Sequence, residues 1–176
     1  MEVRATKLVD SSWLLQRACE MTLHAGKKSN VSLDRMYSCE HSPIRTQLFW
    51  IEMLGIPTFV SVHLTRHNIG VTHFVESNRS DRGTAFVADR TTPVNHGMLI
   101  NAQALINMSR KRLCRCASKE TIQVMKAIKE AILPLDLDLW KHMNEECIYR
   151  NGCFELKGCG FYEQYIRHKE DGGGVS

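Results

Sequence analysis

The strongest constraint on the fold is a pair of adjacent apolar repeats at helical spacing in the second half of the chain. The first predicts a helix that begins at Asn95, its N-cap, and ends near Leu113, with His96 at the surface. Its apolar face consists of Leu99, Ala102, Leu105, Ile106 and Met108. The second predicts a helix over 119–133 that Ser118 caps. Because such helices are stable mainly through their buried apolar faces, the chain must build a packed core around them.

Shorter patterns predict the remaining elements. One helix is expected after Asp10 or Ser11, and another over 58–67, where Pro57 suits a helix start. The candidate strands span 47–53, 72–75 and 84–87, and the first of these would also fit a short buried helix. This mixture of helices and strands predicts an α+β fold.

The composition is that of an ordinary globular protein. The chain has 176 residues, of which 43% are hydrophobic and 24% charged, which excludes a disordered tail, a collagen-like rod and a coiled coil. We expect one domain over 1–168 and a flexible tail over 169–176, which contains three consecutive glycines. No apolar run approaches the length of a membrane span, and the first residues carry no secretory signal, so a cytoplasmic protein is expected.

Basic and hydroxyl side chains are concentrated in one short stretch of the chain. They are Arg66, His67, Thr72, His73, Ser77, Arg79 and Arg82. The planar guanidinium group donates two hydrogen bonds to a phosphate, so this stretch predicts an anion site. The net charge of +4 is mild and suits a small anion as well as a nucleic acid. The other interpretation is a solvated basic loop.

The predicted helix near residue 105 carries amides and a guanidinium on neighbouring faces. Asn101 and Arg112 lie near one face, and Asn107 flanks it. Such groups beside an apolar surface could recognise the hydrogen-bonding edge of a planar heterocycle. The alternative is that Lys111 and Arg112 only complement the negative end of the helix dipole.

Three of the seven cysteines are evenly spaced near the C-terminus. Five residues separate Cys147 from Cys153, and five separate Cys153 from Cys159, with glycines between them. Thiols in a cytosolic chain are expected to be reduced, and this spacing predicts a metal site, with zinc as the candidate ion. The fourth ligand would come from Cys39, His41, Cys114 or Cys116. The alternative is that the cysteines are small buried apolar side chains.

The basic stretch and the helix together resemble the flavin-dependent thymidylate synthases. The resembling order is Arg66-His67, then Ser77-Asn78-Arg79, then Asn-Ala-x-x-Leu-x-Asn-x-x-x-x-Arg at 101–112. Upstream, Glu40-His41-Ser42-Pro43 resembles a short segment before the family's central strand. The resemblance implies a ThyX-like fold, in which helices and a long helical segment flank a central antiparallel sheet. It also implies a homotetramer with sites at subunit interfaces, and a divergent member shortened between residues 82 and 90.

The resemblance also implies roles for individual residues. The positions that match nucleotide-binding residues are His63, Arg66, Ser77, Arg79, Arg90 and Arg112. The positions that match flavin-binding residues are Ser42, Arg66, His67, Asn68, Asn101, Gln103 and Asn107. Arg112 would be the catalytic residue, because it would lie at the pyrimidine edge and favour the N3-ionised, more nucleophilic uracil.

The implied reaction transfers a one-carbon unit from methylenetetrahydrofolate to C5 of dUMP, with FAD reduced by NADPH as the hydride source. Asn68 and Gln103 stand where the family has arginines, and Cys116 stands where it often has histidine. These differences leave two alternatives open: hydroxymethylation of a deoxyuridylate, or a non-catalytic nucleotide- or nucleic-acid-binding protein stapled by zinc. A further possibility makes Cys116, next to Arg112 and Arg115, a thiolate nucleophile.

Overall fold

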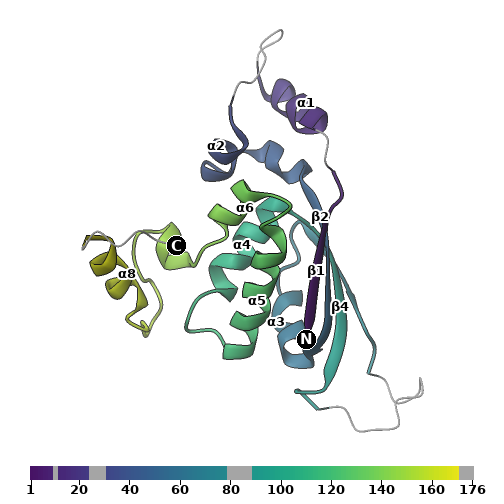
Figure 1. The fold of residues 1–176 in the computed structure, drawn as a ribbon, viewed down its shortest axis with the longest axis vertical. Coiled ribbons are helices and arrows are strands. Elements are labelled where there is room, and N and C mark those ends of the chain that lie inside the picture. Colours follow the sequence, from purple (N-terminus) through teal and green to yellow (C-terminus); the bar gives the residue numbers. More distant parts are fainter. Residues whose placement is uncertain (10–11, 24–30, 79–88, 171–176) are drawn as a thin grey trace.

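An antiparallel sheet of four strands forms the centre of the computed structural model, which describes residues 1–9, 12–23, 31–78 and 89–170 (Figure 1). The strand order is β1-β2-β4-β3. The strands are β1 (Glu2–Lys7), β2 (Leu48–Pro57), β3 (Val71–Val75) and β4 (Pro93–Asn101). The α+β fold with a central antiparallel sheet is therefore confirmed.

Helices cover one side of this sheet. In the described residues they are α1 (Ser12–Thr22), α2 (Leu33–Ser38), the 3-10 helix η1 (Ser42–Thr46), α3 (Thr58–Thr65), α4 (Ala102–Arg112), α5 (Lys119–Ile132), α6 (Leu137–His142), α7 (Glu146–Tyr149) and α8 (Phe161–Glu170). Figure 1 shows α3, α4 and α5 side by side along the sheet. The predicted helices that became α1, α3 and α5 are confirmed, and Ser118 caps α5 through the Thr121 N–H.

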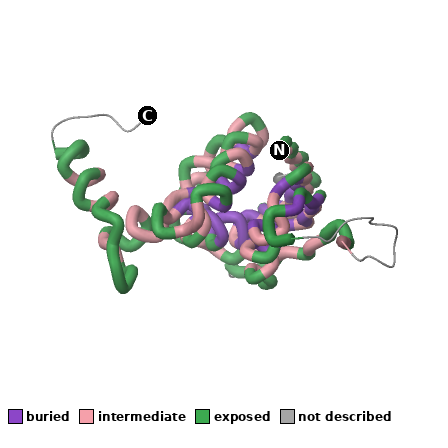
Figure 2. Tube along the Cα trace, turned by 90° about the horizontal axis from the view of Figure 1, so that it is seen from below, coloured by how far each residue is buried: buried purple, intermediate pink, exposed green. Residues whose placement is uncertain are grey.

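The core lies between the sheet and the helices, where Figure 2 shows the buried segments gathered. Alternate residues of β2, such as Phe49, Ile51 and Met53, are fully buried, as β-strand geometry requires when one face is covered. Ile128 of α5 and Leu105 of α4 close the core from the helical side.

The first half of the predicted helix over 95–113 is wrong, because residues 93–101 form strand β4. Val94, His96, Met98 and Ile100 are buried at every second position, which is the period of a strand. β4 pairs with both β2 and β3, and these ladders override the local helical pattern. The helix begins only at Ala102, and His96 is 1% exposed rather than on the surface.

The strand predictions over 47–53 and 72–75 are confirmed as β2 and β3, and the one over 84–87 lies outside the described residues. β2 continues to Pro57 through a bulge at Gly55, whose φ of 68° favours glycine. β1 and the short helices α2, α6, α7 and α8 were not predicted, because each is short or has little apolar periodicity.

The C-terminal part of the chain projects from the rest of the molecule. Residues 144–170 contain no buried residue, and Figure 2 shows them as a pink and green extension. α8 includes residues 169 and 170 of the expected tail, and 171–176 lie outside the described residues. No helix in the described ranges is both long and apolar enough to cross a membrane.

Candidate functional site

Three arginines act electrostatically on His63, and two of them lie at the ends of helices. Arg66 is the C-cap of α3, Arg112 is the last residue of α4, and Arg90 precedes β4. Burial lowers the pKa of His63, and the charges of Arg112, Arg66 and Arg90 lower it further. Within the described part of the chain, no carboxylate forms an ion pair with any of these arginines. We call His63, Arg66, Arg90 and Arg112 the cationic cluster; its uncompensated charge suits an anion.

One contact from α5 and one within α3 hold His63 in place. Its Nδ1 lies 3.0 Å from the Thr121 Oγ1 of α5. Its ring meets Phe59, one turn earlier on α3, edge to face at 5.6 Å. The Arg90 guanidinium lies over the same Phe59 ring at 4.9 Å, so one aromatic side chain positions two members of the cationic cluster.

Arg112 is oriented by His67. The Arg112 Nε donates a hydrogen bond of 3.0 Å to the His67 Nε2, so the proton of this neutral imidazole lies on Nδ1. Burial lowers the pKa of His67 to about 4, with further contributions from Arg112 and His73. In the described residues the two Nη groups of Arg112 have no hydrogen-bond partner. They remain available to a ligand.

A chain of hydrogen bonds runs beneath this site from α3 to the backbone of His67. His73 Nε2 lies 2.7 Å from the His67 carbonyl oxygen, which can only accept, so His73 carries its proton on Nε2. His73 Nδ1 therefore accepts from His96 Nε2 at 2.9 Å, and His96 Nδ1 accepts from the Ser61 hydroxyl at 3.0 Å. We call Ser61, His96, His73 and the His67 carbonyl the histidine chain; it fixes the backbone of the residue that orients Arg112.

The histidine chain was missed in the sequence because His96 was assigned to a helix. On β4 the His96 side chain is buried. This burial lowers the pKa of His96 to about 4, and the nearby His73 makes a smaller contribution in the same direction. The His96 ring is therefore neutral at pH 7, in the tautomer given above. The alternating pattern along β4 is the signal that would have identified His96 as a buried strand residue.

A second polar network links the start of α4 to the segment before η1. The carboxylate of Glu40 accepts from Gln103 Nε2 at 2.5 Å and forms an ion pair with Arg110 Nη2. Burial alone would raise the pKa of Glu40, but the hydrogen bonds from Arg110 and Gln103 outweigh it and lower this pKa. Asn107 Oδ1 accepts from both Gln103 and Arg110. Arg110, which was not predicted, has a buried Nε with no hydrogen-bond partner.

The other expected flavin contacts lie near this network. Asn101 is the N-cap of α4, and its Oδ1 accepts from the Ala104 N–H at 2.9 Å. Its amide packs so closely on Gly70 that a Cβ there would lie 2.5 Å from Asn101 Nδ2. Ser42, the first residue of η1, and Asn68, two residues before Gly70, are exposed.

The structure does not bring every predicted nucleotide residue to the cationic cluster. Ser77 is exposed after β3, and the neighbouring Asn78 donates to Thr58 Oγ1 at 3.4 Å, at the start of α3. Ser77 therefore lies near the opposite end of α3 from Arg66. Arg79 and Arg82 lie outside the described residues.

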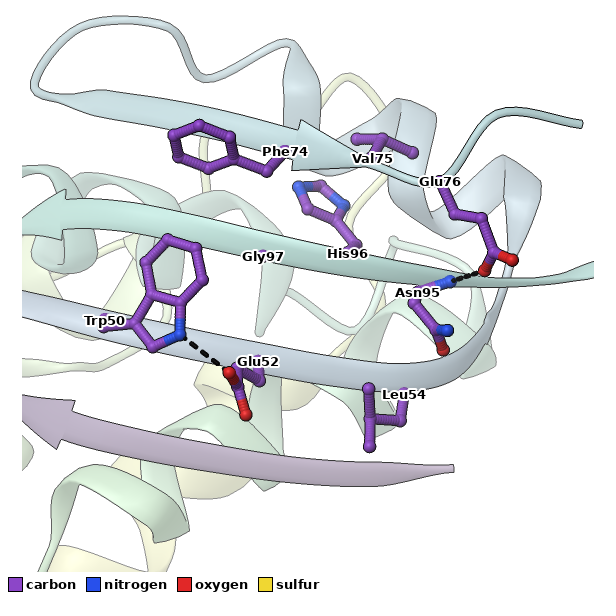
Figure 3. A pocket seen from close by; sticks show the side chains of 9 residues that line it. All are labelled: Trp50, Glu52, Leu54, Phe74, Val75, Glu76, Asn95, His96 and Gly97. Carbon is purple, nitrogen blue, oxygen red and sulfur yellow. Dashed lines mark hydrogen bonds between the residues drawn. The ribbon is translucent and has the colours of Figure 1, made fainter.

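A separate hollow lies on the outer face of the sheet (Figure 3). Its volume is about 530 Å³, and Trp50 and Phe74 form its apolar wall at a ring distance of 5.5 Å. Gly97 between them is required, because a Cβ would lie 2.9 Å from the Trp50 ring. None of the predicted site residues lines this hollow.

The three evenly spaced cysteines line one small cavity together with Cys114. Among the described residues, no three histidine, cysteine, aspartate or glutamate side chains are already grouped around one ion position. The nucleophile hypothesis for Cys116 is not supported, because desolvation and the nearby Cys114 and Cys159 thiols raise its pKa to about 11. At neutral pH this thiol stays protonated.

Comparisons with known proteins show what this fold is similar to. The sequence matches no protein-family model, and a comparison with curated proteins finds no match either. Among solved structures, the flavin-dependent thymidylate synthase ThyX from Helicobacter pylori, complexed with FAD and dUMP, has a TM-score of 0.62 and 15% identity. The match covers 82% of this chain and 100% of that chain.

Two further structures agree. A second ThyX structure from Helicobacter pylori with FAD and dUMP has a TM-score of 0.60 and 13% identity, covering 80% of this chain and 98% of that one. The UMP/dUMP methylase PolB from Streptomyces cacaoi, bound with 5-Br dUMP, has a TM-score of 0.59 and 16% identity, covering 80% and 94%. The expected ThyX-like fold is therefore confirmed.

Proposed function

We propose that this protein transfers a one-carbon unit to C5 of dUMP or a related uridine monophosphate. The observation that carries the proposal is the cationic cluster, which has no carboxylate partner in the described residues and lies in the fold of proteins solved with dUMP or its analogue. A phosphate dianion would be attracted to this cluster, and guanidinium groups would bind it through paired hydrogen bonds.

Arg112 is the proposed catalytic residue. Its burial excludes part of the surrounding water, which strengthens its effect on a developing negative charge. Because His67 holds its Nε, the free Nη groups can face the pyrimidine and stabilise the N3-ionised uracil, which is the better nucleophile at C5. Arg66 and Arg90 are then left for the phosphate, with His63 and Arg79 as further proposed contacts. Ser77, near the opposite end of α3 from Arg66, stays a prediction that rests on the resemblance alone.

FAD is the proposed cofactor, with NADPH and methylenetetrahydrofolate as co-substrates. Residues along α4 suit it, because the Arg110 Nε in its last turn is buried without a partner and the amide of Asn107 is exposed. The remaining proposed contacts are Ser42, Arg66, His67, Asn68, Asn101 and Gln103. When bound, the flavin would supply the hydride that completes the methyl group. A homotetramer with sites between subunits is part of the same proposal.

Hydroxymethylation remains a second candidate because of one contact. Gln103, which stands where the resembling family has an arginine, is bound to Glu40 at 2.5 Å, and Asn68 is also neutral. The flavin half of the site therefore carries less positive charge than the nucleotide half. A product heavier than dUMP by CH₂O, whose hydroxyl oxygen comes from water, would support this alternative.

Binding of dUMP and of deoxyuridine to the full-length protein tests the nucleotide site by calorimetry. We expect deoxyuridine to bind far more weakly, and Arg66→Gln or Arg90→Gln to weaken dUMP binding about 10- to 100-fold, the usual loss for a hydrogen bond to a charged group. Arg17→Gln, in an exposed ion pair on α1, is the matched control. Equal binding of both ligands, or unchanged dUMP affinity in both variants, contradicts the proposal.

The absorbance spectrum of the purified protein tests the flavin part separately. We expect a yellow protein, or one that becomes yellow on incubation with FAD. A protein that binds dUMP but takes up no FAD would overturn the flavin assignment and leave the nucleotide site standing.

A further inference from the structure

We propose that Cys114, Cys147, Cys153 and Cys159 together bind one zinc ion, which fastens the C-terminal segment 146–160 to the end of α4. The evidence for this site does not rest on the proposed function. Cys114 follows the last turn of α4, whereas the other three thiols come from the projecting segment. One ion bound to all four would therefore connect two parts of the chain.

The four thiols share one cavity. Cys114, Cys147, Cys153 and Cys159 all line a largely enclosed space of about 50 Å³ between α4 and the C-terminal segment. Four thiolates are a common structural set for tetrahedral zinc, with Zn–S distances of about 2.3 Å. The sequence spacing alone left Cys39, His41, Cys114 and Cys116 as possible fourth ligands. The cavity selects Cys114.

The C-terminal segment lacks another source of stability. No residue of 144–170 is buried, so the hydrophobic effect contributes little to holding it (Figure 2). Its visible contacts are exposed or half-exposed, such as Arg150 over the Phe154 ring at 3.9 Å and Arg115 over the Phe161 ring at 3.8 Å. Small units without a core usually require a metal or disulfides, and all of the cysteines here are free.

Binding would move the thiols as well as deprotonate them. The metal-binding side chains of the described residues are not yet grouped around one position, but rotation about χ1 re-aims each thiol between staggered wells. Four thiols would release four protons as Zn²⁺ binds, and the resulting tetrathiolate carries a charge of −2. Three cations, Lys111, Arg115 and Arg150, and two carboxylates, Glu146 and Glu155, line the same cavity, so the surroundings are positive overall.

The ion would also shape the surroundings of Arg112. A second cavity of about 260 Å³ is lined by Arg112, Cys114, Cys116 and Glu155. Glu155 belongs to the segment that the zinc would hold, so this wall of the cavity depends on the metal. Release of the ion is expected to open the cavity beside Arg112.

Metal analysis of the full-length wild-type protein, purified without chelator under reducing conditions, is the first test. We expect about one zinc per chain, and, after replacement by Co²⁺, the intense absorption of tetrahedral cobalt thiolates. A chain that retains no zinc and gives no thiolate absorption when titrated with Co²⁺ overturns the proposal. Iron with sulfide in place of zinc also overturns it.

Single variants test the ligand set. We expect Cys114→Ser and Cys153→Ser to lose zinc, and Cys39→Ser, at an exposed cysteine outside the cavity, to retain it. Cys116→Ser is the sharpest control, because Cys116 lies within hydrogen-bonding reach of Cys114 and Cys159 but does not line the four-cysteine cavity. Retention of zinc by Cys116→Ser supports the assignment, whereas its loss there, with retention in Cys114→Ser, contradicts it.

Discussion

Arg112 combines three properties that a pyrimidine-binding cation needs. It is partly buried, it is held at Nε by a neutral histidine, and in the described residues no carboxylate neutralises it. The resemblance identified Arg112 from its spacing, but neither the hydrogen bond to His67 nor the supporting histidine chain is visible in a single sequence. Those contacts join residues 45 positions apart or lie across the sheet, so only the fold reveals them.

Replacing Arg112 is expected to abolish most turnover without unfolding the protein. Arg112→Lys keeps the charge but loses the planar group that donates to His67 and to the ligand at once. We expect kcat to fall about 10²- to 10³-fold, as when one transition-state donor is removed. Steady-state kinetics and thermal melting, with Arg17→Lys as the control, check this prediction. A Lys variant with wild-type kcat would mean that charge alone suffices.

The buried histidines predict an acid-dependent loss of stability. The pKa of His96 is about 4 in the folded protein and 6.5 in the unfolded chain, so protonation favours the unfolded chain. The stability is fully present above pH 6.5 and falls as the pH decreases toward 4. His96 alone accounts for about 3 kcal/mol of this loss.

His96→Gln removes this titration but retains one donor and one acceptor. Denaturant unfolding between pH 7 and pH 4 should therefore show a smaller decrease in stability for the variant than for the wild type. His168→Gln, on the exposed face of α8, should leave the slope unchanged. Parallel curves for His96→Gln and wild type would show that the ring is not held neutral.

At the scale of elements, the junction between β4 and α4 shows where sequence reasoning succeeds and fails. The apolar residues from Leu105 onward predicted α4 correctly, because that half has a helical period and a basic C-terminal end. Residues 95–101 fit both a helical and a strand period. Pairing with β2 and β3, which flank β4, favours the strand, and these neighbours lie outside any local stretch of sequence. The N-cap of α4 is therefore Asn101 and not the predicted Asn95.

The new helix start makes a testable prediction for Asn101. Because its side chain caps the Ala104 N–H, Asn101→Ala should lower the free energy of unfolding by about 1 kcal/mol, whereas Asn101→Asp should retain most of it. Chemical denaturation of the three proteins provides the measurement. If Asn101→Ala is as stable as wild type, the capping bond does not contribute, and a role in flavin binding would be the better explanation for the residue.

At the scale of the whole molecule, the sheet and the helices on one face form a framework that positions two candidate sites. The cationic cluster gathers at the ends of α3 and α4, and the cysteine cavity lies just beyond α4. The sequence predicted the α+β class, all four residues of the cationic cluster and three of the four cysteines, with Cys114 among the candidates for the fourth. It did not predict the projecting C-terminal segment, because a segment without apolar periodicity has no local signature of where it lies.

The most direct test of the proposed function is the mass of the nucleotide formed from dUMP. The purified full-length protein would be incubated with dUMP, methylenetetrahydrofolate, NADPH and FAD, and the nucleotides separated and weighed by mass spectrometry. We predict a product heavier than dUMP by one CH₂ group, formed by the wild type and by Arg17→Gln but not by Arg112→Ala. Recovery of dUMP alone, from a protein shown to bind both dUMP and FAD, would contradict the account.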